Sequence, residues 1–282
     1  MVSWLLEPLA YEFMQRGLLV AVLVGVVCAV VGCYIVLRGM AFLGDALGHA
    51  ILPGLAIGYL ASAGDSTSLF WWALGAAILS SVSISVLSRG RIKQDTAIGI
   101  VFAGMFALGI ALISTMRSYA VDLSHFMFGN ILGVTAADVW LTAGVSAVVL
   151  LIILALYKEF TILSFDPQLA TTLRLPARLL DILLSVLTAV AIVVSLQAVG
   201  VALVVAMLVT PAATAYLLTR NLRRMMLLAA AIAAGSGVVG LYLSFYLNVA
   251  SGAAMVLTCT VVFIAVWLWQ QIRFPHRTIA SK

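Results

Sequence analysis

The sequence predicts an all-α membrane protein that crosses the bilayer many times, and three observations carry this prediction. Hydrophobic residues make up 65% of the 282 residues, whereas charged residues make up 9%. Soluble domains are about 45–50% apolar, because a chain of this size cannot hide much more from water. The apolar residues also form continuous runs of about 20 residues, the length of a spanning helix, without the alternation of barrel strands. The composition therefore excludes a soluble enzyme, a disordered chain and a disulfide-rich scaffold.

Nine apolar segments are long enough to cross a bilayer as helices. They cover residues 17–37, 41–62, 69–88, 96–116, 137–157, 179–197, 199–219, 225–247 and 252–271. The sixth and seventh segments are separated only by the Gln197–Gly200 region, so the boundary between them is not sharply defined. If one of the nine segments is re-entrant, the number of spans is eight. We therefore expect one integral membrane domain, residues 1–282, forming a polytopic helical bundle of about nine (eight to nine) transmembrane helices.

The charged residues predict the orientation of the bundle. If the N-terminus lies outside and the spans alternate, 13 of the 15 basic residues face the cytoplasm, and only Arg16 and Arg117 lie outside. An excess of Lys and Arg on the cytoplasmic side is the usual arrangement in membrane proteins. We therefore expect the C-terminus in the cytoplasm. The net charge of +5 then needs no nucleic-acid partner to explain it.

The outer connection 117–138 is longer than a turn and contains the run Asp122-Leu-Ser-His-Phe-Met-Phe-Gly-Asn130. This run predicts a short interfacial helix that ends at Gly-Asn. Asp122 and His125 are candidate outer-mouth residues for a cation, although an ordinary interfacial histidine is the simpler interpretation of His125.

The inner connection 158–178 also predicts a short helix of its own. Asp166 is suited to cap its first turn, Pro167 to occupy that turn, and Pro176 to stop the helix. A bare link between two spans needs only a few residues. A helix held in a cytoplasmic loop is a natural contact for a partner protein.

Almost every charged residue sits at the end of a predicted span, and the exceptions are Asp45 and His49. A charge at the bilayer centre costs at least about 2.5–3.5 kcal/mol, so such residues are usually functional or paired. Their spacing of four places both on one helix face. A carboxylate and an imidazole so placed can hold a divalent transition metal ion. A structural Asp–His hydrogen bond and a proton relay are the alternative interpretations.

Two ligands are fewer than a metal site usually needs, whereas a twofold-symmetric dimer supplies Asp, His, Asp and His around its axis. Gly44, Gly48 and Gly54 allow close approach of this helix to its neighbours. Pro53 is expected to kink the helix and free a backbone carbonyl. Because a histidine must be neutral to bind a metal, we expect transport to weaken in acid.

The sequence has no G-x-x-x-x-G-K-[ST] motif, so we expect no ATP site of the Walker type. The chain is therefore expected to be a transport subunit and not an enzyme, without a permanently bound cofactor. If ATP drives transport, the ATPase is a separate polypeptide.

Several segments resemble the metal-ion permeases of ABC transporters that import manganese, zinc or iron. The longest is 34–54, Tyr-Ile-Val-Leu-Arg-Gly-Met-Ala-Phe-Leu-Gly-Asp-Ala-Leu-Gly-His-Ala-Ile-Leu-Pro-Gly. Similar matches are 95–109, Phe128-Gly-Asn-Ile-Leu132, Gln197-Ala-Val-Gly200 and Pro211-Ala-Ala-Thr-Ala215. The resemblance covers about residues 15 to 270.

The resemblance implies a homodimer in a bacterial-type plasma membrane, with one ATPase subunit beneath each protomer and an extracytoplasmic metal-binding protein that delivers the ion. It implies that Asp45 and His49 line the translocation path. It also implies that the 164–176 helix seats in a groove of the ATPase. The residues assigned to that contact are Asp166, Pro167, Gln168, Ala170, Arg174 and Pro176.

The chain departs from the family pattern at three positions: Gly48 replaces a common Ser, Gln168 a common Glu, and Arg174 a common Gly. Asp and His ligands suit manganese, iron and zinc alike, so the sequence leaves the metal open. A proton-coupled secondary transporter that uses the Asp–His pair is the main alternative. An ABC permease for a metal chelate is the other.

Overall fold

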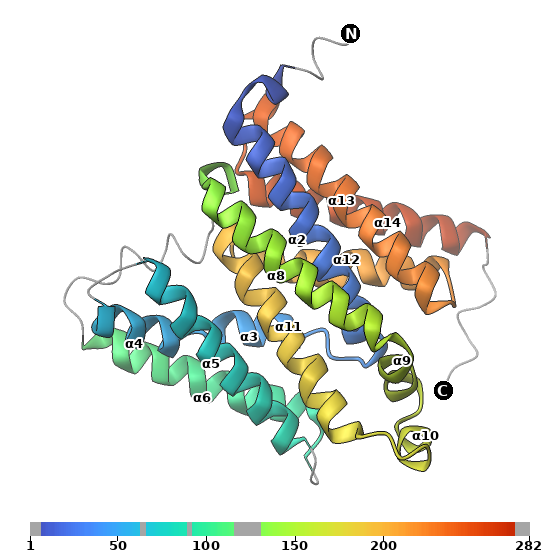
Figure 1. Ribbon diagram of the computed structural model, residues 1–282. Helices are drawn as coiled ribbons and strands as arrows, with labels where there is room; N and C mark the ends of the chain where they lie inside the picture. The colour runs from blue at the N-terminus through green and yellow to red at the C-terminus, as the bar shows by residue number, and fades with distance from the viewer. Residues whose placement is uncertain (1–6, 63–65, 89–91, 116–130, 274–282) are drawn as a thin grey trace.

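The computed structural model of the chain describes residues 7–62, 66–88, 92–115 and 131–273, and every regular element in these ranges is helical. In chain order the α-helices are α2 (Glu12–Leu37), α3 (Leu43–Ala50), α4 (Leu52–Ser62), α5 (Ser66–Leu87), α6 (Gln94–Ser114), α8 (Ala136–Ala155), α9 (Tyr157–Phe165), α10 (Pro167–Thr172), α11 (Ala177–Val199), α12 (Val201–Leu218), α13 (Leu222–Leu247) and α14 (Ser251–Arg273) (Figure 1). Two short 3₁₀ turns, η1 (Pro8–Ala10) and η2 (Ile131–Gly133), precede α2 and α8. The expected all-α bundle is confirmed.

Eight helices of the described chain are long and apolar enough to cross a membrane. The kinked α3–α4 pair forms one of these eight spans, Leu43–Ala61, and α12 adds a shorter apolar stretch, Leu203–Leu218. The uncertain boundary at Gln197–Gly200 is a one-residue turn. Gly200 alone separates α11 from α12, with φ of 80°, a backbone conformation that favours glycine.

Helix α2 lies at the centre of the bundle and packs against α8, α12 and α13. In a bilayer no hydrophobic effect drives apolar helices together, so close packing must hold them. Small residues allow this close approach. A methyl group at Gly32 would overlap the backbone carbonyl of Leu208 in α12, and a methyl group at Gly25 would lie 3.3 Å from the Ala233 backbone in α13. The contact of α2 with α12 therefore depends on glycine.

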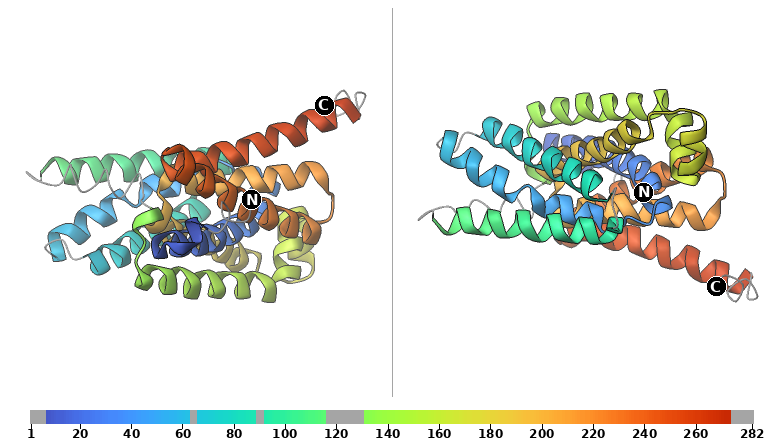
Figure 2. Two further views of the ribbon diagram at one scale, coloured as in Figure 1. Left: turned by 90° about the horizontal axis from the view of Figure 1, so that it is seen from above. Right: turned by 90° about the horizontal axis from the view of Figure 1, so that it is seen from below.

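Helices α6 and α14 lie on one face of the bundle, opposite α8 (Figure 2). Large apolar side chains on α6 and α14 are exposed, among them Ile100, Leu108, Leu257 and Val261. A soluble protein would cover such a surface, so it faces lipid or a second protein in the membrane.

The two ends of the bundle differ in charge. The end of α2, the start of α11, the α12–α13 link and the end of α14 lie at the same end as α10 (Figure 1). The described basic residues at this end include Arg38, Lys158, Arg174, Arg178, Arg220, Arg223, Arg224 and Arg273. The opposite end, where α2 begins, carries Arg16, which pairs with Glu12. This asymmetry is the pattern that the positive-inside rule associates with a cytoplasmic end.

The inner connection differs from the sequence expectation in two ways. It contains two short helices, α9 and α10, where one was expected. Pro176 does not end α10, which finishes at Thr172; Pro176 instead stands at the N-cap of α11. The actual stop is a left-handed residue, Arg174, described below.

Candidate metal path and coupling surface

Helix α3 is short because the chain cannot continue one regular helix through Pro53. Proline has no N–H to donate to the carbonyl four residues earlier, which here belongs to His49. The helix stops at Ala50, the Ile51 N–H donates to the His49 carbonyl, and α4 begins at Leu52. The interruption of the helix predicted at Pro53 is confirmed, whereas the His49 carbonyl is not free, because it accepts the hydrogen bond from Ile51. The result is an eight-residue helix that carries both Asp45 and His49.

Two glycines seat α3 directly on α12. A Cβ at Gly44 would lie 2.8 Å from Leu208 Cδ2, and a Cβ at Gly48 would lie 3.1 Å from Val201 Cγ1. Both distances are shorter than an ordinary van der Waals contact, so a larger residue here would need the Leu208 side chain to turn away or the Val201 side chain to shift by a few tenths of an ångström. The close approach expected from Gly44 and Gly48 is confirmed.

Asp45 and His49 lie on one face of α3, as their spacing predicts. His49 Nε2 is 3.6 Å from Asp45 Oδ1, longer than a hydrogen bond. The His49 side chain is 22% exposed and the Asp45 side chain 38% exposed. The pair therefore keeps free lone pairs on a partly open surface, which weakens its interpretation as a hydrogen-bonded structural pair.

Aromatic side chains of α6 hold the histidine ring. The ring centroid of His49 lies 5.9 Å from that of Phe102 and 5.8 Å from that of Phe106, both edge to face. Within the described residues, His49 Nδ1 is buried and makes no hydrogen bond. The ring is thus fixed by packing, with Nε2 nearest the carboxylate.

One protomer offers too few ligands for a closed metal site. In the ranges that the structure describes, no three His, Cys, Asp or Glu residues lie close enough to hold a metal ion. A metal ion at Asp45 and His49 would therefore need further ligands from backbone carbonyls, water or a second chain.

A second charged pair was missed by the sequence reasoning. Arg38, at the end of α2, forms an ion pair with Asp181 in the first turns of α11, 143 residues away. Their side chains are only 13% and 18% exposed. Asp181 follows Arg178 at the start of an apolar run, so the sequence suggested an ordinary span end. This pair ties the end of α2, just before α3, to the helix that follows α10.

Helix α10 is capped as predicted. The Asp166 side chain accepts hydrogen bonds from the Gln168 and Leu169 backbone N–H groups at 3.0 and 2.9 Å, and Pro167 occupies the first turn. Ala170 is fully buried, so it seats the helix on the bundle and is not free to touch a partner.

Arg174 ends α10 with a φ of 55°, in the left-handed region. The Leu175 N–H donates to the Ala170 carbonyl and the Arg174 N–H to the Thr171 carbonyl. This is the helix stop in which glycine is the usual residue. The backbone at this position favours glycine, so the chain uses an arginine there at a cost in strain.

Three large apolar side chains around α10, Phe165, Leu169 and Leu173, are exposed at the basic end of the bundle. Phe165 is the last residue of α9, Leu169 lies in α10, and Leu173 is the C-cap of α10, so the three residues surround the short helix. An exposed apolar patch of this kind marks a protein contact when it lies beyond the membrane. Asp122 and His125, the candidate outer-mouth residues, lie outside the described residues.

Residues 10–270 match the ABC 3 transport family. The chain belongs to this family. The manganese transport system membrane protein MntC of Halalkalibacterium halodurans is 45% identical over 91% of this chain and 87% of its own length. The chelated iron transport system membrane protein YfeD of Yersinia pestis is 37% identical over 96% of this chain and 90% of its own.

The fold is also that of a solved relative. The structure of PsaBC from Streptococcus pneumoniae in complex with Fab matches with a TM-score of 0.82 and 38% identity, over 97% of this chain and all of the matched chain. The ABC 3 protein described here is therefore a multi-pass membrane permease subunit of a bacterial ABC transporter, and not its ATPase.

Proposed function

We propose that this chain moves a divalent transition metal ion, manganese or iron, into the bacterial cytoplasm as the permease of an ABC importer. One observation supports the role most directly: the Asp45 carboxylate and the His49 imidazole lie side by side, partly exposed, on α3. Relatives at 45% and 37% identity are named for manganese and for chelated-iron transport. Oxygen and nitrogen ligands bind zinc as well, so zinc stays within the proposal.

The site is completed by a second copy of the chain. Because one protomer presents only the Asp45–His49 pair, a twofold axis beside α3 brings four ligands together. Exposed apolar side chains on α6, next to α3, give this face the character of a membrane interface between proteins. The ion then passes between the two protomers.

ATP is hydrolysed by a separate subunit that contacts α10. Asp166, Gln168 and Leu169 lie on the exposed side of this short helix, with Pro167 in its first turn, whereas Arg174 and Pro176 shape the exit into α11. In this arrangement residues 158–178 form the cytoplasmic loop of a single permease domain, residues 1–282. Movement of α10 reaches the site through the Arg38–Asp181 pair and the turn between α2 and α3.

The N-terminus lies outside and the C-terminus in the cytoplasm, which is the orientation that the basic end of the bundle favours. An extracytoplasmic metal-binding protein delivers the ion to the outer end, where Asp122 and His125 are candidate contacts. The ion is bound weakly enough at Asp45 and His49 to leave inward after the nucleotide-driven change.

Two other transport mechanisms are compatible with an Asp–His pair. A proton-coupled carrier would work without ATP, whereas family membership favours an ATP-driven importer. A permease for a metal chelate would not need direct ligands from the chain. The name of the Yersinia relative keeps this second mechanism open.

The deciding experiment is metal uptake into liposomes that contain the permease with its ATPase. Asp45→Ala and His49→Ala should each reduce uptake of free Mn²⁺ at least about tenfold, since loss of a metal ligand costs at least as much as loss of its supporting contacts. Glu12→Gln is the control, because Glu12 is exposed and, among the residues that the structure describes, forms its ion pair with Arg16, one helical turn away.

Wild-type uptake by both alanine variants would show that the pair is not the site. Uptake by the permease alone, without ATP, would instead favour the proton-coupled mechanism. Uptake of a chelate but not of the free ion would favour the chelate permease.

A further inference from the structure

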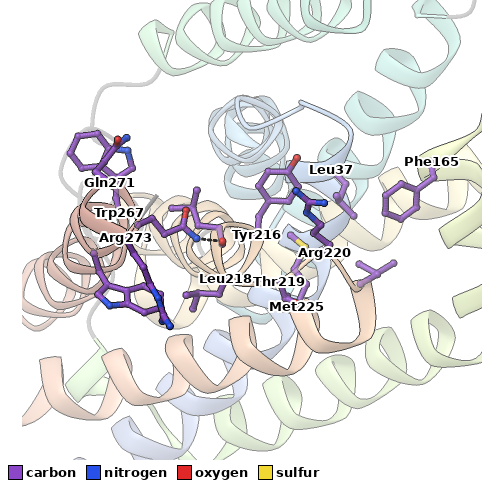
Figure 3. A pocket seen from close by; sticks show the side chains of 14 residues that line it. Leu37, Phe165, Tyr216, Leu218, Thr219, Arg220, Met225, Trp267, Gln271 and Arg273 are labelled. Atoms are coloured by element: carbon purple, nitrogen blue, oxygen red, sulfur yellow. Dashed lines mark hydrogen bonds between the residues drawn. The ribbon is translucent and has the colours of Figure 1, made fainter. Parts of the chain in front are cut away.

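A cavity of about 1050 Å³ opens between the ends of α12 and α14 and the start of α13 (Figure 3). It lies at the α10 end of the bundle and is separate from Asp45 and His49, neither of which lines it. The polar and aromatic residues in its wall include Tyr216, Arg220, Trp267, Trp269, Gln271 and Arg273. The mechanism proposed above makes no use of this cavity.

The cavity is positively charged. Two guanidinium groups, of Arg220 and Arg273, belong to its wall, and the wall contains no Asp or Glu. Among the described residues, neither arginine forms an ion pair with a carboxylate. Arg273 lies over the Trp269 ring, with its guanidinium carbon 5.0 Å from the ring centroid. Arginines of this kind bind phosphate groups through parallel hydrogen bonds.

The wall of the cavity is held together by a hydrogen bond between helices. The Gln270 side-chain amide of α14 donates to the Leu217 backbone carbonyl of α12 (Figure 3). The ends of α12 and α14 are therefore joined next to the two exposed arginines of the wall, which both belong to one cavity.

An exposed apolar stripe leads from the cavity along α14. Leu257, Val261, Ile264 and Leu268 are all exposed and lie on one helix face, and Gln271 continues the same face into the cavity wall. Tryptophan and tyrosine at this level are typical of the boundary between lipid tails and headgroups. Along this surface the apolar stripe comes first, the aromatic residues follow, and the two arginines come last. A phospholipid has the same order of acyl tail, interfacial boundary and headgroup.

We propose that this cavity binds the phosphate-bearing headgroup of an anionic phospholipid from the leaflet at the α10 end, with the acyl chains along the α14 stripe. Basic pockets between membrane helices commonly take such headgroups. Of the exposed apolar side chains around α10, Phe165 also belongs to the cavity wall, whereas Leu169 and Leu173 do not. A protein partner that contacts Leu169 and Leu173 therefore need not enter the cavity. The lipid joins α14 to α12, the helix on which α3 rests.

The test is lipid retention by the purified permease–ATPase complex, measured by native mass spectrometry after exposure to phosphatidylglycerol or phosphatidylcholine. The wild-type complex should retain phosphatidylglycerol in preference. Arg220→Gln with Arg273→Gln should lower that retention on the order of tenfold or more, because each arginine near the lipid surface contributes about 1 kcal/mol. Arg224→Gln is the matched control, since Arg224 is exposed at the same end but does not line the cavity.

Equal retention by the double variant and the wild-type complex would overturn the proposal, as would an equal loss in the Arg224→Gln control. Displacement of the lipid by millimolar inorganic phosphate would also overturn it, because the site would then be one for free phosphate. Loss of the ATPase subunit from the double variant, with lipid retention unchanged, would identify the cavity as a protein contact. Because the readout is lipid binding, failure of the metal-transport proposal leaves this test intact.

Discussion

Two charged pairs lie on either side of the turn between α2 and α3, and they differ in almost every physical respect. Arg38 and Asp181 join two helices, are mostly covered, and make a direct ion pair. Asp45 and His49 share one helix, are more exposed, and stand 3.6 Å apart without a hydrogen bond. The first pair satisfies its charges within the protomer and holds the fold. The second keeps its ligand atoms available, which is what a transient cation site requires.

The largest expected effect is an all-or-none difference in cross-linking. If the Asp45–His49 pair meets its copy across a twofold axis, Asp45→Cys should form a covalent dimer with a short bifunctional thiol reagent. Leu151→Cys on α8 should not, because α8 lies on the opposite face of the bundle and Leu151 is highly exposed there. Non-reducing gels of the membrane-embedded complex measure the product.

Native Cys28, Cys33 and Cys259 are buried, so they give little background in this assay. A dimer band from Leu151→Cys and none from Asp45→Cys would place the symmetry axis elsewhere and leave the metal pair with two ligands.

The next effect separates the two pairs by stability, with the same substitution at each. Asp181→Asn should lower the free energy of unfolding by about 2–5 kcal/mol, because it leaves the covered Arg38 guanidinium without its counter-charge. Asp45→Asn should change it by no more than about 0.5 kcal/mol, as is usual for an exposed position. Thermal unfolding of the purified permease in detergent measures both.

Adding Arg38→Gln to Asp181→Asn should recover part of the loss, since the unpaired charge is then gone. Equal destabilisation by the two Asp→Asn variants would mean that both pairs are structural.

The smallest effect concerns the segment that leads into the helix of Asp181. Arg174→Gly should raise the free energy of unfolding by about 1 kcal/mol, because a left-handed residue other than glycine carries roughly that strain. Arg178→Gly, which removes the same side chain inside α11, should act in the opposite direction. Thermal unfolding again provides the measurement, and a loss of stability at position 174 would mean that the arginine side chain makes a contact worth more than the strain.

Local features of the fold could be predicted from the sequence. Continuous apolar runs predicted the membrane helices, Asp166 and Pro167 predicted the start of α10, and Pro53 predicted the kink below His49. Each of these depends on residues within one or two turns of each other. The spacing of Asp45 and His49 likewise fixed their common helix face.

Contacts between distant segments could not be predicted in the same way. The Arg38–Asp181 pair spans 143 residues, and its existence depends on how α2 and α11 pack. The end of α10 at Arg174 could not be predicted, because arginine is not the residue that usually adopts a left-handed backbone. Ala170 was expected at the partner surface, but which side of α10 faces the bundle depends on tertiary packing.

The glycine seat of α3 on α12 has a mechanical consequence. Gly44 and Gly48 leave no side chain of their own between α3 and the Leu208 and Val201 side chains of α12, so no rotamer change in α3 can absorb a displacement. Close-packed surfaces transmit small strains without damping. A slide of α12 is therefore passed to the helix that carries Asp45 and His49, except for the part that the Leu208 and Val201 side chains of α12 absorb by turning.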